Sequence, residues 1–409
     1  MTAILLQKFH HCYPPEGGWY AGARHLYVFG IITHAAGDDP VEFLRMPIEI
    51  ESPEQLGYDT IRHNLSESSV TDRHFSELNV NLNGLLLCYG DHRGSVDLRE
   101  KIAQTGQGLT ANDVLVTAGA ASALFIIAIS LLDKDSHLVV LRPNYATNIE
   151  TPRTIGCDIS YIDLDFDDGF RLDIGKIEAA IRPDTRYVSL TYPHNPSGVT
   201  ISETELREII ALVERKNCLL LFDETYREMA FGTVLPVAAT LSPNAISVSS
   251  LSKTYGIPGI RIGWLISRDP VLMERFLAAK EQIGISGSMI DEYVGYTALC
   301  QRETWLEQTG RLLREKCALV EEWIGQDEYI EWVKPQGGCV CLPRIRPDLN
   351  ISSSAFYRHL YETYRTYVGP GHWFGLPDHY FRLGFGWPAH SELSEGLSAI
   401  SAAVRSALK

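Results

Sequence analysis

Short apolar runs alternate with segments of helical periodicity between residues 113 and 266. Each run is five or six residues long, the usual length of a buried strand. Two intervening segments, Ser122–Leu132 and Ser202–Lys216, are predicted as helices, and the second opens with the capping box Ser202-x-x-Glu205. Strands that alternate with helices predict an α/β domain, with a mostly parallel seven-stranded sheet between helices. The predicted strands are Asp113–Thr117, His137–Leu141, Asp158–Asp163, Tyr187–Tyr192, Leu219–Asp223, Ala245–Ser249 and Arg261–Ile266.

The pattern changes after residue 268. A long helical region runs to about Gly325, with a break predicted at Gly284–Gly287. Shorter elements follow, namely strands at Tyr329–Val333, Gly338–Leu342, Tyr367–Val368 and Tyr380–Phe385 and helices at Ser353–Tyr364 and Ser391–Leu408. This mixture predicts a second, smaller α+β domain, formed by the N- and C-terminal parts of the chain.

The first 45 residues form a predicted extension. Apolar runs at Ile4–Leu6 and Leu26–Ile32 flank a turn-rich segment, a pattern typical of a hairpin with a long loop. We favour an edge extension packed on the body of the protein. A flap over a substrate entrance, or an arm that reaches a second subunit, is the alternative.

Composition and charge exclude several classes of function. Of the 409 residues, 45% are hydrophobic and 21% are charged, as in ordinary globular proteins. The net charge of −15 repels phosphate groups, so we predict no nucleic-acid partner and no membrane partner. The chain shows no signal-peptide pattern and no apolar run of membrane-spanning length, and its eight cysteines form no CxxC pair, which predicts a cytoplasmic protein. No HExxH motif is present, and no metal site is predicted.

One lysine stands out among small hydroxyl residues after the run Ala245–Ser249. Lys253 follows Ser250-Leu251-Ser252 and precedes a Gly-x-Pro-Gly turn and Arg261. A lysine at a strand end can form a Schiff base, and Ser250 and Arg261 could hold a phosphate beside it. Pyridoxal 5′-phosphate (PLP) requires both functions. Taken alone, the lysine could equally be a solvated surface residue.

Other predicted strands are followed by residues that suit the same cofactor. Gly119, Ala120 and Ala121 lie in the turn before the helix predicted at Ser122–Leu132, where small residues and the free N–H groups of the helix N-terminus could bind phosphate. Tyr145 could lie flat against a planar ring. A tight strand-to-helix turn and core packing are the respective alternatives, and each motif alone favours its alternative.

Two further strands end in polar residues. Asn195, in Asn-Pro-Ser-Gly, could hydrogen-bond a ring oxygen, or could simply belong to a turn. Asp223 ends an apolar strand, where a carboxylate needs a partner such as a protonated pyridine nitrogen. Tyr226 could donate to the ring oxygen. An aspartate that caps the next turn is the alternative for Asp223.

In this order, these motifs resemble those of the fold-type I PLP enzymes, the class I/II aminotransferase family, over roughly residues 46–409. The resemblance implies a large PLP-binding domain at 76–285, a small C-terminal domain at 286–409 and an N-terminal segment, 46–75, that joins the small domain. It implies that Lys253 holds PLP as an internal aldimine. The remaining PLP-binding residues that it implies are Gly119, Ala120, Ala121, Tyr145, Asn195, Asp223, Tyr226, Ser250, Ser252 and Arg261.

Two more residues match the family through motifs outside the sheet. Tyr89, in Tyr-Gly-x-x-x-Gly, matches a tyrosine that reaches the phosphate of the partner subunit, which implies a homodimer with shared active sites. Arg382 matches the arginine that binds the substrate α-carboxylate.

The resemblance implies an aminotransferase that acts on an α-amino acid through a quinonoid intermediate. Finer motifs, Leu65-Ser66-Glu67-Ser68 and Tyr89–Ser95 among them, are similar to a subgroup that includes capreomycidine synthase, which cyclises a hydroxylated arginine. An elimination, replacement or cyclisation enzyme of specialised metabolism is therefore the alternative. A non-catalytic regulator is disfavoured because no basic recognition helix is found.

Overall fold

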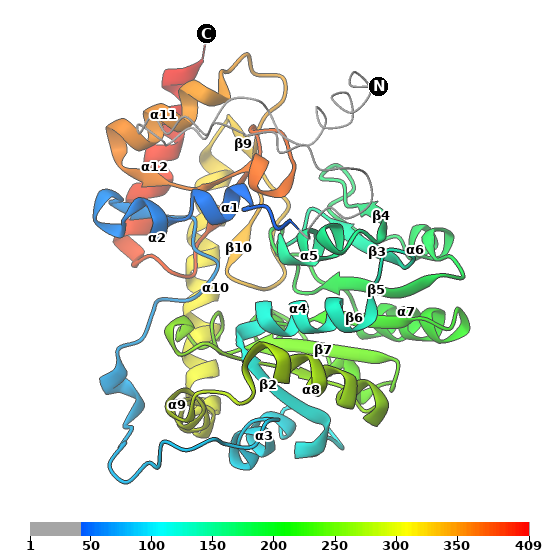
Figure 1. Cartoon of the computed structure of the whole chain (residues 1–409). Coiled ribbons are helices and arrows are strands. Elements are labelled where there is room, and N and C mark those ends of the chain that lie inside the picture. The colour runs from blue at the N-terminus through cyan, green and yellow to red at the C-terminus, as the bar shows by residue number, and fades with distance from the viewer. Residues whose placement is uncertain (1–41, 409) are drawn as a thin grey trace.

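The computed structural model describes residues 42–408 (Figure 1). The hairpin predicted within residues 1–45 lies almost wholly outside the described residues. Residues 42–46 form no helix or strand.

All seven predicted strands belong to one sheet, in the order β2-β8-β7-β6-β5-β3-β4. Strand β8 runs antiparallel to both of its neighbours, β2 and β7, and the other pairs are parallel. The prediction of a mostly parallel sheet is confirmed. Because β3 and β5–β7 run in the same direction, the residues that follow them meet along one edge of the sheet. The strands are β2 (Val114–Ala118), β3 (His137–Arg142), β4 (Asp158–Asp163), β5 (Thr185–Thr191), β6 (Leu219–Asp223), β7 (Ala245–Ser250) and β8 (Ile262–Ile266).

Helices cover both faces of this sheet because its strands are apolar on both sides. Leu138 and Val140 of β3 pack with the helices of one face, and Val139 and Leu141 pack with those of the other. The first face carries α4 (Gly119–Leu131), α5 (Thr147–Ile155) and α8 (Pro270–Gly284), and the second carries α6 (Ile174–Ala180) and α7 (Glu203–Arg215). Near β2 and β8, α3 (Val96–Ala103) packs with α9 (Met289–Cys300).

A second core joins the two ends of the described chain. Strand β1 (His63–Asn64) pairs with β12 (Thr366–Tyr367), so the N-terminal segment lies beside the C-terminal elements, as Figure 1 shows. Leu65 packs in one cluster with Phe356, Leu383 and Ile400. The other elements of this part are α1 (Pro47–Ile50), α2 (Pro53–Leu56), α10 (Arg302–Gln326), β9 (Ile330–Glu331), β10 (Val340–Cys341), β11 (Arg344–Ile345), α11 (Ser353–Tyr364), β13 (Gly369–Pro370), β14 (Phe381–Gly384) and α12 (His390–Ala407). The domain limits of the sequence analysis stay a prediction.

Among residues 42–408, no helix is both long and apolar enough to cross a membrane. The same residues contain no group of histidine, cysteine, aspartate or glutamate side chains arranged to hold a metal ion.

Candidate active site

A cavity of about 390 Å³ lies between the sheet edge, the N-terminal segment and β14. Most residues predicted to bind PLP or substrate line it, although they come from distant parts of the sequence. They are Ala120, Ala121, Tyr145, Asn195, Asp223, Tyr226, Ser250, Ser252, Lys253, Arg261 and Arg382. Gly119 lies directly beside this wall at the start of α4, whereas Tyr89 is not part of it.

Lys253 follows β7, and a hydrogen bond to its main chain fixes its position. Its carbonyl oxygen accepts a hydrogen bond of 3.1 Å from Val70 N, which ties the lysine loop to the N-terminal segment. Burial lowers the pKa of Lys253; the charge of Glu67 opposes this effect and that of Arg382 adds to it. A lowered pKa increases the neutral fraction of the amine, the form that acts as nucleophile and base.

The Arg261 guanidinium lies at the N-terminus of α4. Gly119 has a φ of +79°, which residues with a side chain rarely adopt, and a Cβ atom there would displace the guanidinium of Arg261. Arg261 Nη1 donates to Ser252 Oγ at 3.4 Å, and Ser250 Oγ accepts from Ser252 N at 3.3 Å. A cation, hydroxyls and the free N–H groups of a helix terminus therefore converge on one point, which suits an anion.

A buried histidine joins the two loops that carry Tyr145 and Asn195. His194 Nε2 lies 2.9 Å from Pro143 O. Burial lowers the pKa of His194 to about 4, so the ring is neutral and its Nε2–H donates to this carbonyl. Asn144 Oδ1 accepts from Tyr145 N at 2.7 Å. The sequence analysis missed His194 and Asn144, although each is adjacent to a predicted site residue.

Asp223 ends β6 with 5% of its surface exposed. Its Oδ1 accepts from Thr225 N at 3.1 Å and from Thr225 Oγ1 at 2.6 Å. Burial raises the pKa of Asp223, and the hydrogen bonds from Thr225 oppose that rise. The carboxylate has no cation beside it among the described residues, so a positively charged ligand atom would stabilise it.

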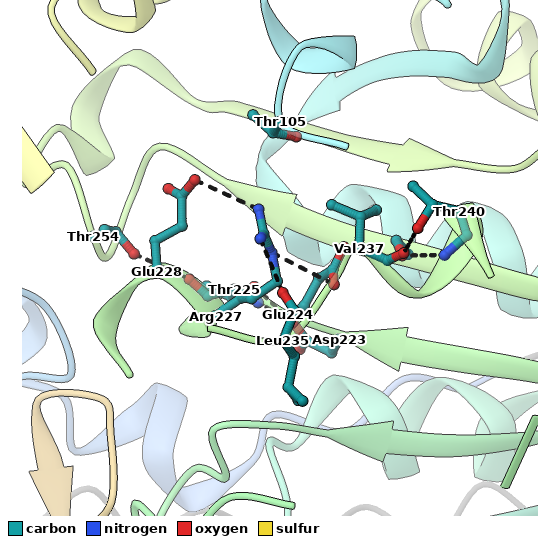
Figure 2. Close-up of polar contacts among 12 residues, drawn as sticks. Thr105, Asp223, Glu224, Thr225, Arg227, Glu228, Leu235, Val237, Thr240 and Thr254 are labelled. Atoms are coloured by element: carbon teal, nitrogen blue, oxygen red, sulfur yellow. Dashed lines mark hydrogen bonds and ion pairs between the residues drawn. The ribbon is translucent and has the colours of Figure 1, made fainter. Parts of the chain in front are cut away.

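Figure 2 shows the polar network behind this turn. Arg227 lies 3.7 Å from Glu224 and 3.5 Å from Glu228, and it donates to Leu235 O at 3.2 Å. Thr254 Oγ1, next to Lys253 in sequence, donates to Thr225 O at 3.2 Å. The network fixes the turn after Asp223 and connects it to the lysine loop. Sequence reasoning had not identified Glu224 or Arg227.

Tyr226 uses its hydroxyl within the protein. The hydroxyl donates to Ser68 O at 3.1 Å, which links the strand-end turn to the N-terminal segment. Its contact with a ring oxygen stays a prediction.

Arg382, on β14, is 4% exposed and faces the cavity. Its Nη2 donates to Ser66 O at 2.7 Å and its Nη1 to Asn195 Oδ1 at 3.3 Å. Its Nε has no hydrogen-bond partner among the described residues, and the guanidinium lies 5.2 Å from the ring centroid of Phe374. A buried donor without a partner is costly, so a ligand carboxylate fits here.

The family model described as aminotransferase class I and II matches residues 64–400. The chain belongs to the class I and II aminotransferase family. It is 28% identical over 298 residues to the arginine–pyruvate transaminase of Pseudomonas aeruginosa, covering 70% of this chain and 75% of that protein. It is 26% identical over 383 residues to the capreomycidine synthase of Streptomyces vinaceus, and the match covers 90% of this chain and 96% of that protein. The PLP-dependent cyclase OrfR superposes with a TM-score of 0.81 at 27% identity, covering 92% of this chain and all of that one.

This member of the class I and II aminotransferase family is a PLP-dependent enzyme, and its cavity fits that cofactor. Three features support the fit: an amine at Lys253, an anion cradle in which Gly119 leaves room for the Arg261 guanidinium, and the buried carboxylate of Asp223. When bound, PLP supplies an aldehyde for imine formation and a ring that takes up electrons from Cα.

His372 anchors the N-terminal segment of this family member beside the cavity. Its Nε2 lies 2.9 Å from Glu51 Oε2 and its Nδ1 lies 2.9 Å from Asp378 Oδ1. Burial by itself lowers the pKa of His372, but the two carboxylates outweigh burial and raise the pKa to about 9. Trp373 Nε1 also donates to Glu51 Oε2, at 2.8 Å.

We expect His372→Gln to lower the free energy of unfolding by about 1–3 kcal/mol near neutral pH and below. Because the folded pKa lies above the usual value, this stabilisation is complete below about pH 6.5 and is lost as pH rises through about 9. Urea unfolding of both proteins across that range measures the difference. His390→Gln, at a half-exposed histidine, is the control. An equal difference in unfolding free energy at all pH values would contradict the assignment of a raised pKa to His372.

Proposed function

We propose that this protein is an aminotransferase that removes the amino group of an α-amino acid and transfers it to a 2-oxo acid. The observation that carries the proposal is one cavity in which Lys253, Asp223 and Arg382 meet. These are an amine, a buried carboxylate and a buried guanidinium with an unpaired donor.

Lys253 is the catalytic residue of the proposal. Its side chain would anchor PLP in the resting protein and would be free once an amino acid is bound. Its Nζ would then accept the proton from the substrate Cα and become an ammonium. The lowered pKa of Lys253, caused by burial, favours the neutral form that this step needs.

The other residues would hold the reactants in place. Asp223 would keep the ring nitrogen protonated, Tyr145 would stack on the ring and Asn195 would bind the ring oxygen. Tyr226 would also donate to the ring oxygen once its hydroxyl turns away from Ser68 O. The phosphate is held by Ser250, Ser252, Arg261 and the backbone of Gly119, Ala120 and Ala121. Arg382 binds the substrate α-carboxylate with its guanidinium, which aims Cα at Lys253.

A homodimer with shared active sites is part of the proposal. Tyr89 is 81% exposed and neighbours Leu86 and Leu87, which are 72% and 71% exposed. Three such apolar side chains in one segment are unusual on a monomer. We propose that this segment packs on a second subunit and that Tyr89 reaches its phosphate site. A monomeric mass in sedimentation at micromolar concentration would exclude this arrangement.

A second candidate is elimination, replacement or cyclisation on the same cofactor. The likeness to capreomycidine synthase over 90% of the chain, and to the cyclase OrfR, favours it. The cofactor-binding residues are compatible with either route. The routes differ in the role of Lys253 after it has accepted the Cα proton. In transamination Lys253 would return that proton to the cofactor. In elimination or cyclisation it would keep the proton, or give it to the leaving group, while a side-chain group is lost or attacked.

Mass spectrometry of the PLP-loaded protein mixed with single amino acids distinguishes the two routes. Transamination predicts a 2-oxo acid and the pyridoxamine form of the cofactor in equal amounts. A substrate that is consumed without any pyridoxamine form would refute transamination and support the second candidate.

A further inference from the structure

Four carboxylates line the cavity without a role in the proposed function. They are Glu49, Glu54, Glu67 and Asp72. Lysine and arginine side chains also line the cavity, but each has a proposed partner in PLP or in the substrate carboxylate. Within the described part of the chain, no lysine, arginine or histidine forms an ion pair with any of the four carboxylates. The cavity therefore keeps an excess of negative charge.

The charge of Glu67 acts on both basic groups of the proposed chemistry. Its Oε1 accepts a hydrogen bond of 3.1 Å from the Tyr58 hydroxyl. Burial lowers the pKa values of Lys253 and Arg382, and the charge of Glu67 acts against that effect at both. Glu67 is thus within electrostatic reach of the two groups between which the substrate Cα would lie.

Asp72 also accepts a hydrogen bond from an aromatic residue, Trp387, whose ring stacks on that of Tyr58. Trp387 Nε1 donates to Asp72 Oδ2 at 2.9 Å. The rings of Tyr58 and Trp387 are stacked, with centroids 6.2 Å apart and planes 15° from parallel. Each aromatic residue orients one carboxylate through a neutral donor, which adds no positive charge beside that carboxylate.

Carboxylates next to aromatic rings favour one class of ligand group. A carboxylate binds an ammonium or guanidinium through charge-assisted hydrogen bonds, and an aromatic face attracts the same cations. Independently, Arg382 is 4% exposed, lines the same cavity and has an unpaired Nε, which indicates a binding site rather than a solvated acidic surface.

We propose that the substrate has a positively charged side chain, an amine or a guanidinium, which Glu67 and Asp72 bind beside Tyr58 and Trp387. The inference rests on the proposed function, because it requires an α-amino acid anchored at Lys253 and Arg382. An acidic side chain would be repelled from this position.

The test is a spectral titration of the PLP-loaded protein with pairs of amino acids that differ mainly in charge. The pairs are L-arginine with L-citrulline and L-lysine with L-norleucine. We expect wild-type protein to bind the charged member at least about tenfold more tightly. Glu67→Gln, which retains an acceptor for Tyr58, is expected to weaken binding of the charged member by about 10- to 100-fold. Binding of the neutral member should change little.

Two controls accompany the titration. Glu303→Gln, at a side chain that is 88% exposed and outside the cavity, should bind like wild type. Asp72→Asn should reproduce the charge-selective loss, which guards against misfolding of one variant. The spectrum of each variant before substrate is added reports on bound PLP.

The failures can be told apart. If neutral or acidic amino acids are bound and converted while arginine and lysine are not, the inference is wrong and the proposed function stands. The inference is also wrong, and the proposed function stands, if Glu67→Gln weakens the binding of both members of a pair equally. If no amino acid of any charge alters the spectrum or is converted, the proposed function is overturned and the inference with it.

Discussion

Lys253→Ala is expected to abolish the visible absorption of the PLP-loaded protein at its wild-type position and to lower turnover by at least about 10²- to 10⁴-fold. Alanine can neither form the imine nor take the Cα proton, so both functions of the residue are lost together. The absorption spectrum after PLP addition and dialysis, followed by turnover with any active amino acid, measures the two effects.

Lys334→Ala is the matched control, because Lys334 is an exposed lysine that pairs with Glu321 and lies outside the cavity. It should keep the wild-type spectrum and rate. Retention of the wild-type spectrum by Lys253→Ala, or the absence of any such band from wild type after PLP is added, would refute the assignment of Lys253.

Arg382→Lys is expected to lower kcat/KM for α-amino acids by roughly 30-fold, because loss of a hydrogen bond between charged groups in a buried site costs about 1.5–3 kcal/mol. Lysine keeps the charge but loses the planar fork that matches a carboxylate, and it leaves Ser66 O and Asn195 Oδ1 without their donors. Steady-state kinetics with the best amino acid measures the loss.

A comparison with the amine analogue that lacks the α-carboxylate tests whether Arg382 acts on that group. Wild type should process the analogue poorly, and Arg382→Lys should depress its rate far less than that of the amino acid. Arg314→Lys, at an exposed arginine of α10, should have no effect on either compound. An equal loss with both compounds would indicate that Arg382 supports the fold and does not bind the carboxylate.

The sheet was predictable because its strands are local apolar runs. Strands β4 and β6 have the predicted limits, and the other five differ by no more than two residues at either end. Helix α7 was predicted through its periodicity and capping box, which the structure contains. Helix α5 was not predicted individually, since Pro152 lies inside it, and α6 has only seven residues. Short elements carry too little periodic signal to be recognised.

The cofactor-binding residues were also accessible from the sequence. In a parallel sheet, residues that follow successive strands must meet at one edge, so Lys253, Asn195 and Asp223 could be placed together before any coordinates existed. Arg382 required the family resemblance, because nothing local to its short strand indicates a binding role.

The contacts among side chains around that edge could be found only in the tertiary structure. Asp72 and Trp387 are 315 residues apart, and Arg382 and Ser66 are 316 residues apart. No local periodicity connects such residues, since their contact arises only when β1 pairs with β12 and the two ends of the chain share one core. The sequence by itself therefore determined the sheet and the cofactor, and it predicted Lys253 as the lysine that would hold that cofactor. Only the tertiary structure placed Tyr58, Glu67 and Asp72 around the substrate cavity, because that surface is assembled from both ends of the chain.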